Sequence, residues 1–129
     1  MSDKFTVEII TPNETILKTE TNEVNIPSFE GNMGILKDHI SLITFLRPGL
    51  IIVEGDEKKK FYVEEGTVEF SNNNLLILTS TVRDLTDFNQ SSIANLLNQA
   101  EKKLSETNSS DKERYLLSYK ISTLKEINQ

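Results

Sequence analysis

Residues 40–54 have the sequence Ile40-Ser41-Leu42-Ile43-Thr44-Phe45-Leu46-Arg47-Pro48-Gly49-Leu50-Ile51-Ile52-Val53-Glu54. The stretch contains two short runs rich in Ile, Leu, Val and Phe, and a Pro-Gly pair lies between them. β-Branched and aromatic residues favour strands, whereas Pro-Gly favours a turn. The stretch therefore predicts two strands, over Ile40–Leu46 and Leu50–Glu54, joined by a tight turn.

The same pattern extends in both directions through the first two thirds of the chain. Further apolar runs are expected as strands over Phe5–Ile9, Val24–Ile26, Lys60–Val63, Thr67–Phe70 and Leu75–Thr79. Turn-forming residues separate them at Thr11-Pro12-Asn13, Gly55-Asp56 and Asn72-Asn73-Asn74. Short strands at this spacing predict about eight to ten strands in one β-sandwich or small barrel.

The chain changes character after Phe88, because it contains neither Gly nor Pro beyond that residue. Apolar side chains recur there at helical spacing in two stripes, Ile93, Leu96, Leu97, Ala100 and Leu104, and then Leu117, Ile121 and Leu124. Asp87 is the expected cap of the first helix, with Gln90 three residues later. The polar segment Ser105–Ser110 separates the stripes, and Ser110 with Glu113 matches a capping box at the second helix. Two helices joined by a short turn make an antiparallel hairpin.

These patterns predict a β + α protein, with a β-sandwich domain over residues 1–86 and a helical hairpin over residues 87–129. Residues that are poor helix formers lie inside the hairpin, namely Asn95, Asn98, Ser118, Ser122 and Thr123. Isolated helices of this length are marginal in water. The hairpin should therefore depend on docking against the sandwich or against a partner.

Composition excludes several kinds of functional site. The chain has no Cys, and His39 is its only His. A disulfide framework, a cysteine nucleophile and a thiolate or multi-histidine metal site are therefore excluded. No acid–base pair or phosphate-binding glycine loop stands at a catalytic spacing, so an independent enzyme is disfavoured.

Charge and hydropathy restrict the classes of partner that the chain is expected to bind. The net charge of −6 argues against general affinity for nucleic acid. The longest apolar runs, such as Leu75–Leu78, fall far short of the about 20 residues of a membrane-spanning helix. The first residues show neither an apolar signal core nor an Arg-rich presequence. We expect no direct membrane insertion and a protein that stays on the cytosolic side of the membrane it serves.

The segment Ile26–His39 resembles the signature of the epsilon subunit of F-type ATP synthases, called delta in mitochondria. That family carries Glu-Gly-x-x-Gly-Ile followed by a short turn and a histidine, here Glu30-Gly31-Asn32-Met33-Gly34-Ile35 and His39. Pro48-Gly49 matches its Pro-Gly turn, Tyr62–Phe70 its strand–glycine–strand segment and Leu75–Thr79 its last core strand. The resemblance covers nearly the whole chain, although the helices match mainly in length and position.

The resemblance implies an N-terminal ten-stranded β-sandwich, a C-terminal antiparallel α-helical hairpin, and a role in the central stalk. Such a subunit is not catalytic; it binds the gamma subunit and the c-subunit ring and couples proton flow to ATP synthesis in the catalytic head. By resemblance, a loop from Phe29 to His39 faces these partners, with Met33-Gly34-Ile35 exposed. The implied interface residues are Phe29, Glu30, Gly31, Asn32, Met33, Gly34, Ile35 and His39.

The resemblance also concerns the hairpin. In many bacterial members it extends into the head, meets the alpha and beta subunits and inhibits ATP hydrolysis. Basic residues on the second helix would then meet acidic side chains, and these are Lys112, Arg114, Lys120 and Lys125. Some members bind ATP through an aspartate and an arginine at the first helix start, where this chain has Asn89 and Ser92. We therefore expect no bound cofactor and no ATP binding by the hairpin.

Two alternatives stay open at this point. The chain could be a stand-alone β-sandwich binding module with a helical interaction tail, in which case the match around His39 is accidental. Within an ATP synthase, the hairpin could brace the stalk without inhibiting it. The resemblance implies a peripheral location on the cytoplasmic face of a bacterial inner membrane.

Overall fold

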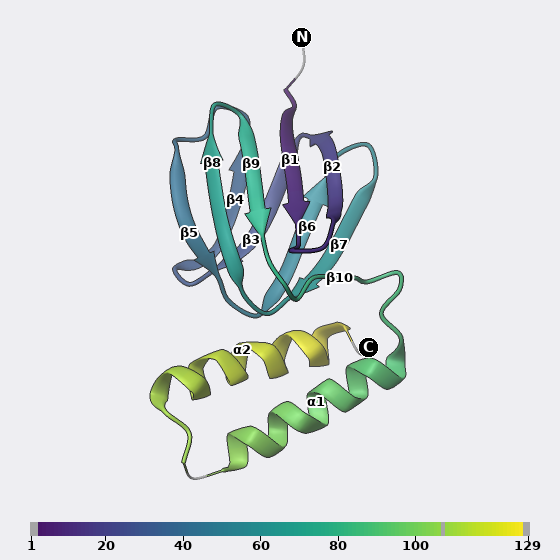
Figure 1. Cartoon of the computed structure of the whole chain (residues 1–129), viewed down its shortest axis with the longest axis vertical. Coiled ribbons are helices and arrows are strands. Elements are labelled where there is room, and N and C mark those ends of the chain that lie inside the picture. Colours follow the sequence, from purple (N-terminus) through teal and green to yellow (C-terminus); the bar gives the residue numbers. More distant parts are fainter. Residues whose placement is uncertain (1–2, 107, 128–129) are drawn as a thin grey trace.

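A computed structural model describes residues 3–106 and 108–127. Ten strands precede two helices, and the predicted fold class is confirmed (Figure 1). The strands are β1 Phe5–Ile10, β2 Thr15–Thr21, β3 Glu23–Ser28, β4 Gly31–Leu36, β5 Leu42–Leu46, β6 Gly49–Glu54, β7 Lys58–Val63, β8 Gly66–Ser71, β9 Asn74–Leu78 and β10 Arg83–Asp84. The helices are α1 Gln90–Ser105 and α2 Asp111–Ile127.

The strands form one sheet that curls into two facing layers (Figure 1). Their order is β10-β7-β6-β3-β5-β8-β9-β1-β2, and β4 pairs with β3 beside this path. β1 and β9 run parallel, whereas the other pairs are antiparallel. Alternate side chains of β1, β6 and β8 are buried in the pattern expected of half-buried strands. Their apolar side chains form a core between the layers, with Val7, Ile9, Ile51 and Ile77 wholly buried.

Three strands were not predicted from the sequence. β2 carries mostly exposed polar side chains at the end of the sheet order, and β10 has only two residues. β4 corrects the expected loop between Phe29 and His39, because Gly31–Leu36 pairs along its whole length with β3. Its two glycines disguise the alternation that would otherwise indicate a strand.

The sequence predicted the cap of α2 correctly and the cap of α1 wrongly. Ser110 caps α2, since its hydroxyl oxygen accepts from the Glu113 N–H at 3.1 Å. α1 is capped by Asn89, whose Oδ1 accepts from the Ser92 N–H at 2.8 Å, and not by Asp87. Within the described residues, neither helix is long and apolar enough to cross a membrane.

A second apolar cluster joins the hairpin to the sandwich. Tyr62 from β7, Phe88 from the connecting segment, Ile93 from α1 and Leu124 from α2 are buried together. α2 lies between α1 and the end of the sheet, so α2 provides most of the contact with the sandwich (Figure 1). The sandwich core contains no helical residue. The hairpin is therefore an addition to a sandwich whose own core is complete.

Candidate interaction surfaces

The turn between β3 and β4 carries the first of the implied interface residues. Phe29 and Glu30 form its exposed tip, and Phe29 has 38% of its surface accessible. The Ser28 hydroxyl fixes the turn, since it donates to the Gly31 carbonyl at 2.7 Å and accepts from the Glu30 N–H at 3.2 Å. Gly31 has a φ of +119°, which residues with a Cβ rarely adopt. The turn thus presents an aromatic ring and a carboxylate on a fixed backbone.

Strand β4 distributes the next implied interface residues over two faces. Asn32 and Gly34 are exposed, whereas Met33 is half-buried against the sandwich core. The side chain of Ile35 is wholly buried in that core. The expectation of an exposed Met33-Gly34-Ile35 segment is therefore wrong for Ile35, because successive side chains of a strand point to opposite faces.

His39 lies beyond the other end of β4 from Phe29. It is half-buried, its Nδ1 is 2.8 Å from the carbonyl oxygen of Ile40, and its ring meets Phe70 edge to face. A strand of this length spans about 20 Å. The structure therefore does not bring His39 together with the Phe29 turn, and the implied interface consists of two separate parts.

An exposed apolar strip, which the sequence analysis did not identify, runs along β5 from Ile40, next to His39, to Phe45, next to Phe29. We define the apolar strip as Ile40, Ile43, Phe45 and Leu78, whose exposed fractions are 79%, 75%, 58% and 44%. Phe45 pairs with Thr67 and Thr67 with Leu78, so β5, β8 and β9 share this outer face. Contiguous exposed apolar surface on a small protein commonly marks a protein interface. The sequence signal for this strip was that β5 carries apolar residues on both of its faces.

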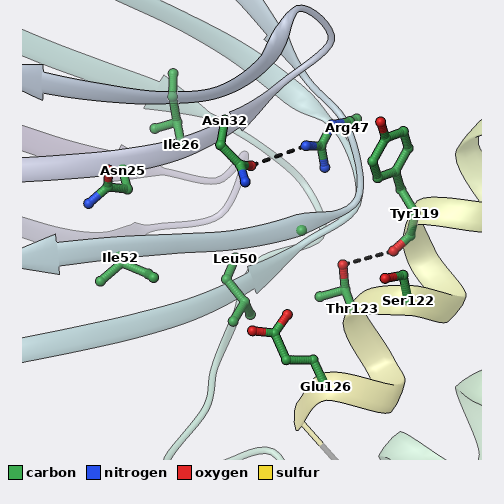
Figure 2. A pocket seen from close by; sticks show the side chains of 11 residues that line it. Asn25, Ile26, Asn32, Arg47, Leu50, Ile52, Tyr119, Ser122, Thr123 and Glu126 are labelled. Carbon is green, nitrogen blue, oxygen red and sulfur yellow. Dashed lines mark hydrogen bonds between the residues drawn. The ribbon is translucent and has the colours of Figure 1, made fainter.

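Aromatic and cationic side chains attach α2 to the β3–β4 hairpin. The Tyr115 hydroxyl donates to the Phe29 carbonyl at 3.2 Å, and their rings stack with centroids 5.9 Å apart. One turn further along α2, the Tyr119 ring centroid is 3.8 Å from the guanidinium carbon of Arg47 (Figure 2). Arg47 Nη2 in turn donates to Asn32 Oδ1 at 3.1 Å. The docked hairpin therefore contacts part of the implied partner surface.

A largely covered ion pair adds to this docking. Lys120 Nζ on α2 is 3.1 Å from Glu64 Oε2, and the same oxygen accepts from the Tyr62 hydroxyl at 3.0 Å. Burial, reinforced by Glu64, raises the pKa of the Tyr62 phenol far above its ordinary value. The phenol therefore stays protonated and continues to donate to Glu64. Lys120, one of the four residues implied as inhibitory contacts, is already paired in this structure.

The other implied inhibitory contacts are distributed along α2. Lys112 and Lys125 are exposed near its two ends, and Arg114 Nη1 donates to the Leu104 carbonyl at 3.4 Å. The arginine therefore contacts the end of α1, where helix carbonyls lack internal partners. The four basic residues do not form one cluster in the docked hairpin.

The positions that match the nucleotide motif lie at the start of α1. Asn89 and Ser92 hydrogen-bond to each other as the helix cap, so no aspartate or arginine is available there. In the described part of the chain, no group of three or more His, Cys, Asp or Glu side chains is arranged to hold a metal ion. At this end of the hairpin, the Asn89 side chain caps α1.

Comparisons with known proteins point to one family. The model of the ATP synthase delta/epsilon chain beta-sandwich domain matches residues 4–84. An ATP synthase epsilon chain of Pelagibacter ubique is 45% identical over 99% of this chain and 100% of its own length. The mitochondrial ATP synthase subunit delta of Schizosaccharomyces pombe is 40% identical over 85% of this chain and 66% of its own. A chain in the Euglena gracilis mitochondrial ATP synthase, solved as OSCP/F1/c-ring, has the same fold, with a TM-score of 0.75 at 19% identity over 97% of this chain and 79% of that one.

Proposed function

Because this chain belongs to the delta/epsilon family of ATP synthase central-stalk subunits, we propose that it couples rotation of the proton-driven c ring to ATP synthesis in the catalytic head. The resemblance carried by Ile26–His39 is confirmed, and the chain is a subunit that is not catalytic by itself. The family match over almost the whole chain sets aside the stand-alone binding module. The partners that we propose within the complex are supported by the surfaces described above.

The apolar strip supports gamma as one partner. Ile40, just before β5, and Ile43, on β5, have more than 70% of their surface exposed, and the other face of β5 is in the core. Burying such side chains contributes about 1.5–3 kcal/mol each. An exposed apolar sheet face suits a stable packing contact with a second rigid subunit. His39 at the edge of this strip belongs to the same surface.

The β3–β4 turn supports the c ring as the second partner. Its exposed tip, Phe29 and Glu30, adjoins the strip at Phe45, because the Phe29 N–H donates to the Phe45 carbonyl at 3.0 Å. Ile40 and His39 lie beyond the other end of β5, so two partners would bind side by side along this strand. A c ring holds the subunit at the membrane, and the chain itself has no described helix that could span one. We place the subunit peripherally, on the cytoplasmic face of a bacterial inner membrane.

Replacing Ile43 with Asp should separate gamma from this chain. The carboxylate would sit in the centre of the apolar strip, and burying it without a partner costs several kcal/mol. We expect at least a tenfold loss of gamma in co-purification with the tagged chain. Lys18→Asp on β2 is the control, because Lys18 is exposed and pairs with Glu8 on the outer face of the sheet. Equal recovery of gamma with both variants would show that the strip is not its binding surface.

The hairpin supports a second, regulatory role. α2 combines buried apolar residues with exposed Lys112 and Lys125, and its docking rests on a limited set of contacts. A hairpin held in this way can leave the sandwich at modest cost. We propose that it then inserts between the alpha and beta subunits and inhibits ATP hydrolysis, in preference to bracing the stalk only.

The hairpin is not expected to respond to ATP. Asn89 and Ser92 supply neither a carboxylate for the ribose nor a cation for the phosphates. Calorimetry on the full chain should therefore show no saturable ATP binding up to about 1 mM, which corresponds to about −4.1 kcal/mol. The double variant Asn89→Asp, Ser92→Arg should gain measurable affinity, because it restores both motif charges. Micromolar binding by the unmodified chain would contradict the motif argument.

A further inference from the structure

A cavity of about 360 Å³ lies between the sandwich and α2. Figure 2 shows it from close by, with β-strand residues on one side and α2 residues on the other. Its polar lining consists of Asn25, Asn32 and Arg47 from the sandwich and Tyr119, Ser122, Thr123 and Glu126 from α2. A ligand in this cavity that touched both sides would connect the two parts of the protein.

Arg47 is the unusual group in this cavity. It is only 7% exposed, and its Nε is buried without a hydrogen-bond partner in the structure. Nη1 donates to the Pro48 carbonyl at 3.2 Å, Nη2 donates to Asn32 Oδ1 at 3.1 Å, and Tyr119 covers one face. Among the described residues, no carboxylate forms an ion pair with it. All its partners are neutral.

A buried cation of this kind is costly without an anion. Neutral acceptors and an aromatic face compensate only part of the lost hydration of a guanidinium. An oxyanion in the cavity would supply the missing charge and accept from the Nη N–H groups, because arginine binds oxyanions through pairs of N–H groups. The Ser122 hydroxyl lines the same cavity from α2, and a hydroxyl can donate to an oxyanion.

The acidic residues near the cavity restrict which anion fits. The Asn25 amide already donates to Glu23 Oε2 at 3.1 Å and to Glu54 Oε2 at 3.3 Å, so it is not offered to a ligand. Glu126 lies toward the end of the cavity away from Arg47 (Figure 2). A ligand that carries a hydroxyl can donate to this carboxylate, whereas a fully deprotonated anion would only be repelled by it.

We propose that this cavity binds a small oxyanion that retains a hydroxyl group, of which phosphate is the simplest example. Its charged oxygens contact Arg47 of the sandwich and Ser122 of α2, and its hydroxyl points along the cavity toward Glu126. Because the ligand contacts both parts, it stabilises the docked hairpin over the extended one. The site is separate from Asn89 and Ser92, and it does not depend on the partners proposed above.

The test uses the full chain and inorganic phosphate, with potassium chloride at the same ionic strength as the reference. Phosphate should give saturable one-to-one heat in calorimetry and should increase hydrogen-exchange protection of α2. Arg47→Met should weaken binding at least tenfold. Arg83→Met should leave it unchanged, because Arg83 is an exposed arginine that contacts Phe88, outside the cavity. Sulfate should bind more weakly, since it carries no hydroxyl at neutral pH.

A second variant separates lost binding from a disturbed hairpin. Ser122→Ala keeps Arg47 against Tyr119 and should weaken phosphate binding about threefold, as expected for one neutral hydrogen bond. Absence of saturation, or equal affinity in the Arg47→Met and unmodified chains, would overturn the site. Sulfate binding as tight as that of phosphate would overturn the requirement for a hydroxyl and, with it, the role of Glu126.

Discussion

Chains that end at Phe88 are expected to support ATP synthesis while the assembled complex hydrolyses ATP several-fold faster than the complex with the full chain. The sandwich core consists of side chains from residues 5–82 and contains no helical residue, so the sandwich should fold without the hairpin. The apolar strip and the β3–β4 turn also remain. What disappears is the element that we propose inserts into the catalytic head.

The truncation removes part of the apolar cover over Tyr62. Tyr62 loses its contacts with Ile93 and Leu124, but Phe88 stays over it with ring centroids 5.5 Å apart. Ending the chain after Phe88 therefore preserves a cover for this ring. Hydrolysis and proton-driven synthesis should be measured on the same membranes. Unchanged hydrolysis beside normal synthesis would mean that the hairpin only braces the stalk.

Replacing Leu124 with Asp should release the hairpin from the sandwich. Leu124 is wholly buried against Tyr62 and Ile93, so the variant loses apolar packing and must hydrate a carboxylate. Loss of a buried leucine side chain alone costs about 2–5 kcal/mol, and burying an unpaired charge adds more. Undocking of the hairpin costs the least free energy, because it exposes the carboxylate to water without disturbing the sandwich core.

Hydrogen exchange resolves this prediction segment by segment. Protection should fall in α1 and α2 and should remain in β1, β6 and β9. Lys125→Asp is the matched control, since Lys125 is the exposed neighbour on the same helix. Helices that stay protected in Leu124→Asp would mean that other contacts hold the hairpin. Loss of protection in the strands as well would mean that sandwich and hairpin unfold together.

The strands that could be predicted from the sequence are those that put apolar residues into the core. β1 alternates plainly, and β6 and β9 are short apolar runs, so each is visible on its own. β2 is different, because it packs at the edge of the sheet with mostly polar side chains, and only its pairing with β1 makes it a strand. Long-range pairing of that kind leaves little trace in a local pattern.

The residues of the interaction surfaces could also be predicted only in part, because their placement depends on contacts between distant segments. The resemblance located the Glu30–His39 segment, but only the pleat of β4 determines that Ile35 belongs to the core. Arg47 looked like part of a turn, and its contact with Tyr119 joins residues far apart in the chain. Asn89 was interpreted only as a departure from the nucleotide motif, and Asp87 was expected to cap the first helix. In the structure the Asn89 side chain satisfies a free N–H group of α1.

All three tyrosines of the chain lie where the hairpin meets the sandwich, and the chain has no tryptophan. Tyr62 is buried under the hairpin, Tyr115 stacks on Phe29, and Tyr119 covers Arg47. Ultraviolet absorption and emission above the phenylalanine range therefore originate entirely from this junction. The protein carries an intrinsic optical probe of its hairpin position, which needs no label and can be followed in real time.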